Sequence, residues 1–208
     1  MLLPGLQRGV LRRAIAALRP GLRDIDFAAV ERALAFARAP SRSGQLSLVQ
    51  GLTLFLEEGR LYLADEGAQI ENADWPQLTQ GETLTLETPG RLELGGSWTL
   101  ESRFARAEGD GFTADRWEVW LDARQVELPL VVRAMRAGER FQPLGMDGRS
   151  QKLSDFWINA GLPRRARSRW PLVCSRGEVA WIPGYRLDHR FRITSTTWDA
   201  IHLVLLKK

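Results

Sequence analysis

Nine basic residues crowd into one segment of this sequence, residues 133–169, where only three acidic residues accompany them. The net charge of this segment, +6, exceeds the +4 of the whole chain. Guanidinium and ammonium groups at this density bind phosphate oxygens through charge-assisted hydrogen bonds. The segment therefore indicates a polyanionic partner, and the alternative is a solvated basic face that binds nothing in particular.

The two parts of the chain differ in charge in the same way. Residues 1–132 hold 14 basic and 19 acidic side chains, a net charge of −5, whereas residues 133–208 hold 15 and 6, a net charge of +9. A change of sign of this size suggests that the second part docks on phosphates while the first part does different work.

Turn-forming glycines interrupt the basic segment at Gly138, Gly145 and Gly148. Tight turns expose backbone N–H groups, which join guanidinium groups in holding phosphate oxygens. A short amphipathic helix is expected over residues 152–159, with Gly161 as its stop signal. The alternative role for each cation is a surface ion pair of little worth. Six cations beside these features are our candidates for contact with a nucleic-acid backbone: Arg140, Arg149, Lys152, Arg164, Arg165 and Arg167.

Other residues of the basic part are expected to serve the fold. Arg133 and Arg136 follow a predicted strand, and we expect them to pair with Glu139 or Asp155. Tryptophans can stack on unpaired bases. Apolar neighbours instead favour core packing for Trp157, Trp170 and Trp181.

Hydrophobic periodicity predicts the elements that position these residues. Apolar residues recur at helical spacing over residues 7–18 and 27–38, with Asp26 as the N-cap of the second segment, so a helical hairpin is expected. From residue 43 onward the period changes to two, and residues 58–59 fit a tight turn. Strands are expected at residues 46–49, 52–56, 61–63, 82–87, 91–94, 97–104, 117–121 and 128–132.

The order of these elements predicts an α+β fold, with an N-terminal helical hairpin followed by antiparallel strands and then a C-terminal α+β domain. Polar residues 122–127 separate the last strand of the acidic part from the strand that opens the basic part. We therefore place a domain boundary between residues 125 and 126, which gives domains at residues 1–125 and 126–208.

The sequence offers little support for enzymatic chemistry. The one cysteine, Cys174, lies in an apolar run and is expected to be a buried thiol. The two histidines, His189 and His202, have no metal-ligand spacing, so no metal site is expected. The Gly-Gly-Ser run at residues 95–97 lies between two predicted strands, which favours a hairpin turn over a phosphate loop. No serine or cysteine nucleophile is recognisable beside a base, and no catalytic residue is predicted.

The N-terminal residues do not fit a signal peptide, because arginines stand where such a peptide needs its apolar centre. No apolar run approaches the length of a membrane helix. A cytoplasmic protein without membrane association is expected.

Five short motifs carry a family resemblance: RAGERFQPLGM at residues 136–146, KLSDF at 152–156, PRR at 163–165, WPLV at 170–173 and WIPG at 181–184. Their order and gaps resemble the C-terminal domain of bacterial tRNA(Ile)-lysidine synthetases. Residues 2–63 resemble the middle, substrate-binding region of that family more weakly, and residues 64–125 resemble nothing distinctive. Where the family commonly has two adjacent lysines this chain has Gln151 and Lys152, and Glu139 replaces the more usual aspartate.

The resemblance implies a function. The family uses ATP to activate the wobble cytidine of isoleucine tRNA with a CAU anticodon and joins lysine to it. An N-terminal ATP-pyrophosphatase domain with an SGGxDS loop performs that chemistry, while the downstream domains hold the tRNA. The C-terminal domain is implied to contact the acceptor end of the tRNA and to be similar to a domain of the phenylalanyl-tRNA synthetase β subunit.

This sequence contains no SGGxDS motif. The resemblance therefore implies the tRNA-holding portion of the ligase, with no cofactor of its own and with ATP and Mg²⁺ bound in the missing catalytic domain. The implied partners are the isoleucine tRNA and that catalytic domain. The sequence leaves a homodimer open as a further assembly. The alternative function is a stand-alone RNA-binding or protein-interaction module without enzymatic activity. A small hydrolase that uses Asp155 or His189 is a further, weaker alternative.

Overall fold

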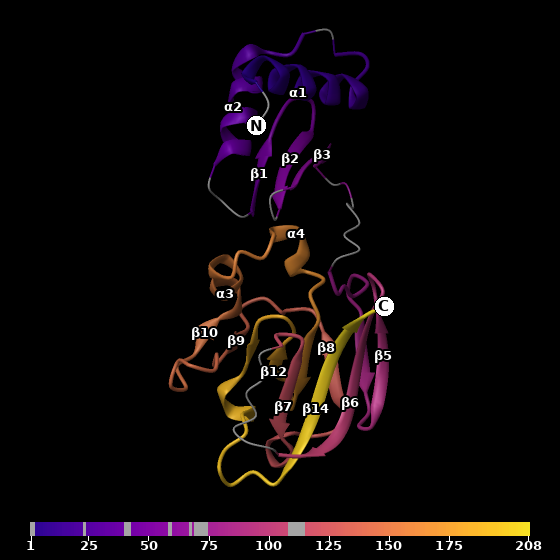
Figure 1. Ribbon diagram of the computed structural model, residues 1–208, viewed down its shortest axis with the longest axis vertical. Helices are drawn as coiled ribbons and strands as arrows, with labels where there is room; N and C mark the ends of the chain where they lie inside the picture. The colour runs from indigo at the N-terminus through magenta and orange to yellow at the C-terminus, as the bar shows by residue number, and fades with distance from the viewer. Residues whose placement is uncertain are drawn as a thin grey trace. The chain divides into compact units, whose positions relative to one another are not determined.

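The computed structural model describes residues 3–22, 24–39, 43–57, 60–66, 68, 75–107 and 115–208 (Figure 1). The chain divides into two compact units, Met1–Glu71 and Asn72–Lys208, called here the N-terminal unit and the C-terminal unit. Both combine helices with antiparallel sheets, which confirms the predicted α+β class.

Two helices open the N-terminal unit, α1 (Pro4–Leu18) and α2 (Phe27–Arg38). Helix α2 begins where predicted, because the carboxylate of Asp26 accepts a hydrogen bond from the backbone N–H of Ala28 at 3.2 Å. Not every apolar residue of the two helices is buried. Val10 and Phe27 are each 60% exposed, since only the residues on one side of each helix reach the core.

A three-stranded antiparallel sheet completes this unit, with the order β1 (Ser43–Ser47), β2 (Leu52–Glu57) and β3 (Arg60–Asp65). Leu52 and Leu54 of the central strand pack in one core with α1 and α2. The first strand ends earlier than predicted because residues 49–52 form a turn with positive φ at Gln50 and Gly51. The turn predicted at residues 58–59 lies outside the described residues.

The C-terminal unit contains two larger antiparallel sheets (Figure 1). The five-stranded sheet has the order β13 (Arg186–Leu187), β12 (Glu178–Ile182), β11 (Leu172–Ser175), β8 (Leu130–Arg133) and β4 (Thr83–Leu86). The four-stranded sheet has the order β5 (Gly90–Leu94), β6 (Trp98–Arg106), β14 (Asp199–Lys207) and β7 (Glu118–Asp122).

Shorter elements complete the unit. A two-stranded ribbon is formed by β9 (Arg140–Phe141) and β10 (Gln151–Lys152), and helices α3 (Leu153–Asn159) and α4 (Arg164–Arg167) follow it in the chain. Two 3₁₀ turns are η1 (Ala123–Gln125) and η2 (His189–Phe191). The helix predicted at residues 152–159 is thus confirmed, with Lys152 at its N-cap.

Each face of the five-stranded sheet covers a hydrophobic core. Successive residues of a strand point to opposite faces, and β11 supplies both cores in this way. Val173 packs between the two sheets with Leu100 and Leu203 of the four-stranded sheet. Cys174 packs on the other side with Trp157 of α3.

The domain boundary predicted between residues 125 and 126 is wrong, because it cuts through both sheets. Strand β4 pairs with β8, and the C-terminal strand β14 lies between β6 and β7. Trp117 lies against Gly184, where an added Cβ would come within 2.6 Å of the Trp117 ring. The polar stretch that suggested a boundary is η1, a local turn in which the Asp122 carboxylate accepts from the backbone N–H of Arg124 at 3.0 Å. The chain divides instead between residues 71 and 72.

A buried ion pair fixes the junction between the five-stranded sheet and the ribbon. Arg133, at the end of β8, donates to both carboxylate oxygens of Glu139 at 2.5 and 3.1 Å, and the two side chains are 4% and 11% exposed. Arg133 also donates to the carbonyl of Gly177 in the turn between β11 and β12, at 3.2 Å. Burial acts to lower the pKa of Arg133, but the hydrogen bonds and charge of Glu139 outweigh it and raise that pKa. The predicted pairing of Arg133 is confirmed.

Glu139 extends this junction through its backbone and its second oxygen. Its carboxylate accepts from the backbone N–H of Arg136 at 2.9 Å, which closes a turn with positive φ at Gly138. Its carbonyl accepts from the N–H of Leu153, the first residue of α3, at 2.9 Å. One residue therefore sets the start of β9 and the start of α3.

Removing Glu139 leaves a buried charge without a partner. We expect Glu139→Ala to lower the free energy of unfolding by about 3–5 kcal/mol, the cost typical of breaking a buried ion pair. Urea unfolding followed by tryptophan fluorescence measures this loss. The control is Glu127→Ala, whose ion pair with Arg176 is exposed and is expected to contribute less than about 1 kcal/mol. Equal losses in the two variants would contradict the role given to Glu139.

Burial also controls the chemistry of Cys174, whose pKa it raises from 9.0 to about 12. The thiolate is the reactive form, so the native protein at pH 8 should hold about a thousandfold less thiolate than an exposed cysteine would. We expect no measurable reaction with a disulfide reagent in the native state and one equivalent after unfolding in guanidinium. Rapid labelling of the native protein would show that this part of the core is open.

Candidate polyanion-binding surface

The ribbon places two candidate cations directly opposite each other. Arg140 and Lys152 are cross-strand partners in the register of β9 and β10, and both side chains are exposed. The other pair of the ribbon, Phe141 and Gln151, faces the opposite way. Like charges directly opposite in an antiparallel pair destabilise it. The ribbon therefore carries a local repulsion that a bound anion would relieve.

Hydrogen bonds hold one of these cations in place. Arg140 donates through Nε to Oγ of Ser150 at 3.0 Å and through Nη2 to the carbonyl of Ser150 at 2.9 Å. The ammonium group of Lys152 has no hydrogen bond or ion pair within the described part of the chain. The pair thus combines a fixed guanidinium with a mobile stem whose charge is available to a ligand.

Two successive turns carry the third candidate, Arg149, on the loop between β9 and β10. In the first, the N–H of Met146 donates to the carbonyl of Pro143 at 3.2 Å, and Gly145 has a φ of +92°. In the second, the N–H of Arg149 donates to the carbonyl of Met146 at 2.9 Å, with positive φ at residues 147 and 148. Arg149 is exposed at the end of this turn. Arg140, Arg149 and Lys152 therefore belong to one hairpin, which we call the cationic hairpin.

A tight C-terminal cap connects α3 to the second group of candidates. Gly161 has a φ of +70°. The N–H of Leu162 donates to the carbonyl of Trp157, and the N–H of Gly161 donates to the carbonyl of Ile158, both at 3.1 Å. This is a Schellman motif, which ends the helix and redirects the chain. Pro163 then becomes the N-cap of the single-turn helix α4.

The three arginines of α4 have different environments. Arg164 is exposed. The guanidinium of Arg165 lies over the ring of Trp75 at 4.7 Å, a cation–π contact. Arg167 donates through Nε to the carbonyl of Leu162 at 2.9 Å, and burial, followed by the charge of Arg164, lowers its pKa. The structure thus places the six candidates in two groups, three on the cationic hairpin and three on α4.

The predictions for the tryptophans and for Asp155 have different outcomes. The rings of Trp157, Trp170 and Trp181 are buried, as predicted. Asp155 accepts a hydrogen bond from Ser154 at 3.3 Å, and within the described residues it has no ion pair with an arginine. The expected pairing of Arg133 is therefore with Glu139 and not with Asp155.

Sequence reasoning missed a hollow beside the cationic hairpin. It has a volume of about 490 Å³ and is lined by the Pro143–Met146 turn together with Gln151, Phe156, Tyr185 and Arg186. Arg186 lies outside the basic segment at residues 133–169, so the density of charge in the sequence did not identify it as a site residue. Its position two residues after the WIPG motif was the available signal.

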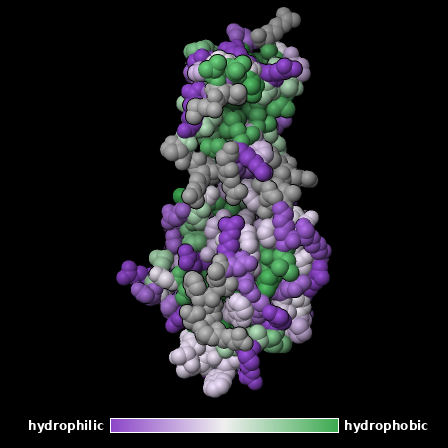
Figure 2. All heavy atoms as spheres, in the orientation of Figure 1, coloured by the Kyte–Doolittle hydropathy of each residue, from purple (hydrophilic) through white to green (hydrophobic). Residues whose placement is uncertain are grey.

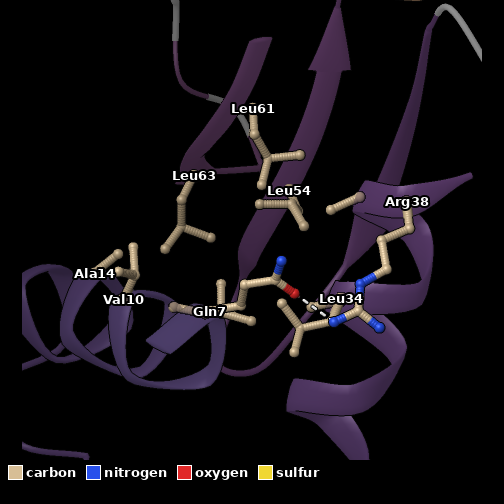
Figure 3. Close-up of a pocket in the computed structure, with 11 residues that line it drawn as sticks. Gln7, Val10, Ala14, Leu34, Arg38, Leu54, Leu61 and Leu63 are labelled. Atoms are coloured by element: carbon tan, nitrogen blue, oxygen red, sulfur yellow. Dashed lines mark hydrogen bonds between the residues drawn. The ribbon is translucent and has the colours of Figure 1, made fainter. Parts of the chain in front are cut away.

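The N-terminal unit carries a hollow of a different kind, shown in Figure 3, with a volume of about 400 Å³. Leu34, Leu54 and Leu63 line it, and Gln7 and Arg38 are hydrogen-bonded to each other at its edge. Figure 2 shows apolar residues gathered on the visible face of this unit. With Arg38 already engaged, this hollow offers an apolar surface and is a poor phosphate site.

The described residues do not support a metal site or a catalytic histidine. His202 accepts a hydrogen bond from Nε of Arg103 at 2.8 Å and shares a hydrogen bond with Glu118 at 2.5 Å. Burial lowers the pKa of His202, which favours the neutral imidazole. His189 lies in η2, where its backbone N–H donates to the carbonyl of Gln142 at 2.7 Å. No group of three or more potential metal ligands occurs in the described ranges.

Residues 95–97 form the turn between β5 and β6, as predicted, and a strand follows them. A phosphate loop needs a following helix whose N–H groups face the ligand, so this turn does not fit ATP. No helix in the described part of the chain has the length and apolar character to cross a membrane.

The comparisons with known proteins agree with this geometry. A family model described as the TilS substrate C-terminal domain matches residues 130–203. The chain is 31% identical to the tRNA(Ile)-lysidine synthase of Symbiobacterium thermophilum, over 98% of this chain and 42% of that protein. It is 28% identical to that of Geobacter sulfurreducens, over 92% and 39%.

A solved structure supports the same relationship. The crystal structure of a TilS C-terminal domain aligns with a TM-score of 0.52 and 28% identity, over 61% of this chain and 98% of that chain. This chain spans about two fifths of the length of the two relatives above. It belongs to the tRNA(Ile)-lysidine synthase family, and residues 130–203 match the model of that family's C-terminal domain.

Proposed function

We propose that this chain is the tRNA-holding portion of a tRNA(Ile)-lysidine synthase. Its contacts with the tRNA backbone are made by two groups of cations, Arg140, Arg149 and Lys152 on the cationic hairpin and Arg164, Arg165 and Arg167 on α4. The observation that carries the proposal is the cross-strand pairing of Arg140 with Lys152.

The energetics of that pair support a phosphate ligand. The two like charges occupy one face of a two-residue ribbon, an arrangement that costs stability in the free protein. The acidic residue nearest in sequence, Glu139, is already committed to Arg133. A phosphate placed between the two cations replaces their repulsion with two charge-assisted hydrogen bonds. The repulsion is therefore best explained as part of a binding surface.

The α4 group fits a supporting role in the same surface. Arg165 makes a cation–π contact with Trp75, and Arg167 donates a hydrogen bond to the carbonyl of Leu162. A guanidinium has five N–H donors, so the one bond from Arg167 to the carbonyl of Leu162 leaves others for a phosphate. Arg164, which is exposed, provides the most direct contact of the three.

The proposal divides the reaction between this chain and a catalytic domain. The catalytic domain binds ATP and Mg²⁺ and joins lysine to the wobble cytidine of isoleucine tRNA with a CAU anticodon, while this chain holds the tRNA. The absence of an SGGxDS motif from the sequence supports this division. The partners proposed are the tRNA, the catalytic domain and a second copy of the chain, and the proposed compartment is the cytoplasm.

The salt dependence of tRNA binding tests the hairpin directly. The log–log slope of affinity against salt falls by about 0.9 for each phosphate of a duplex that the protein no longer neutralises. Because the two cations share one phosphate, we expect Arg140→Gln/Lys152→Gln to reduce the slope by about 0.9 and to weaken binding of isoleucine tRNA at low salt, measured by fluorescence anisotropy.

A matched control removes two exposed arginines from the other sheet of the same unit. Arg91→Gln/Arg106→Gln changes the net charge equally, and both side chains are exposed. We expect its slope to equal that of the wild type. If the two double variants behave alike, the effect is one of net charge and the assigned surface is wrong.

A further inference from the structure

The hollow beside the cationic hairpin has the chemistry of a site for a whole nucleotide. Its walls come from three separate parts of the fold: the Pro143–Met146 turn, the C-terminal half of α3 and the start of β13. Its volume of about 490 Å³ is within the range of small-ligand sites. A single phosphate would fill only a small part of it.

Partly buried aromatic rings form the apolar lining. Phe156 packs edge-on against the buried Phe141 at 5.0 Å and against Tyr185 at 6.1 Å. Tyr185 is held in turn by Trp157 and Trp170, at 5.3 and 5.4 Å. Phe156 and Tyr185 also line the hollow, so they present rigid aromatic surface to its interior. Such surface binds the face of a nucleobase at little entropic cost.

Polar groups complete the lining. Gln151 and Asn159 line the hollow, and each side-chain amide offers both donors and acceptors, as the edge of a base requires. Arg186 is exposed and has no hydrogen bond or ion pair from its side chain within the described ranges. Aromatic surface, amides and one cation together match the base and the phosphate of a nucleotide. An apolar ligand would leave the amides without partners.

Strand β10 contributes one residue to the hollow and the next residue to the proposed phosphate surface. Gln151, which lines the hollow, is adjacent in sequence to Lys152, and alternation along the strand directs the two side chains to opposite faces of the ribbon. An RNA strand that crosses the two-stranded ribbon would therefore place a phosphate on Arg140 and Lys152 at one face and a nearby nucleotide in the hollow at the other.

We propose that this hollow binds one unstacked nucleotide of the RNA that docks on the cationic hairpin. This inference rests on the proposed function and deepens it, because it adds a site that requires unpaired RNA. A paired base cannot enter, since its face is stacked and its edge is occupied within the duplex.

Filling the hollow tests the inference. Ala160 lines it and follows α3 with ordinary helical backbone angles, so Ala160→Trp introduces a large side chain without backbone strain. Ile158→Trp is the matched control, because Ile158 lies on the same helix, is 62% exposed and does not line the hollow. Circular dichroism and thermal unfolding check that both variants fold.

The probes are a short single-stranded oligouridylate and a blunt-ended RNA duplex, with binding measured by fluorescence anisotropy at low salt. We expect Ala160→Trp to weaken binding of the oligouridylate about 5- to 150-fold, the loss that follows when one base loses its stacking partner. Binding of the duplex should not change. Ile158→Trp should bind both probes as the wild type does.

A second variant guards against a folding defect. Arg186→Gln should weaken binding of the oligouridylate more than that of the duplex, whereas Arg176→Gln, which alters an exposed arginine paired with Glu127, should have no such preference. Wild-type affinity of Ala160→Trp for the oligouridylate, or equal weakening for both probes, would overturn the inference and leave the salt-dependent surface intact. If the wild type binds neither probe, the proposed function fails and this inference fails with it.

Discussion

The buried ion pair between Arg133 and Glu139 is the contact on which the candidate surface depends. It joins the end of a central strand to the turn that begins the ribbon, and the carbonyl of Glu139 also anchors the first residue of α3. A buried pair of charges is stable only when both partners are fully bonded. Here the carboxylate and the guanidinium each have additional backbone partners. The pair therefore fixes where β9 begins, at Arg140, and where β10 ends and α3 begins, after Lys152.

This arrangement separates two kinds of arginine that look alike in the sequence. Arg133 is buried in its ion pair with Glu139, and Arg169 donates a hydrogen bond to the carbonyl of Leu78 at 2.9 Å. Arg140, Arg149 and Arg164 keep their charges at the surface. The basic residues of the C-terminal part are thus divided between cations bonded within the fold and exposed cations, which we propose to bind RNA.

Local patterns in the sequence predicted much of the fold, because helices, turns and caps depend on neighbouring residues. Asp26 and Gly161 marked helix ends correctly, and the period of two marked the strands. The domain boundary failed because strand pairing is not local: β14, at the end of the chain, inserts between β6 and β7. The hollow was missed for the same reason, since it joins a turn, a helix and Arg186 from distant parts of the sequence.

The most direct test of tRNA holding is the binding of this chain alone to isoleucine tRNA with a CAU anticodon and to elongator methionine tRNA, which shares that anticodon, across a salt series. We expect binding to both with a steep salt dependence, because phosphate contacts fix position without reading sequence. Tighter binding to the isoleucine tRNA would add discrimination to that role. Absence of binding, or binding that is insensitive to salt, would contradict the claim that these cations hold tRNA.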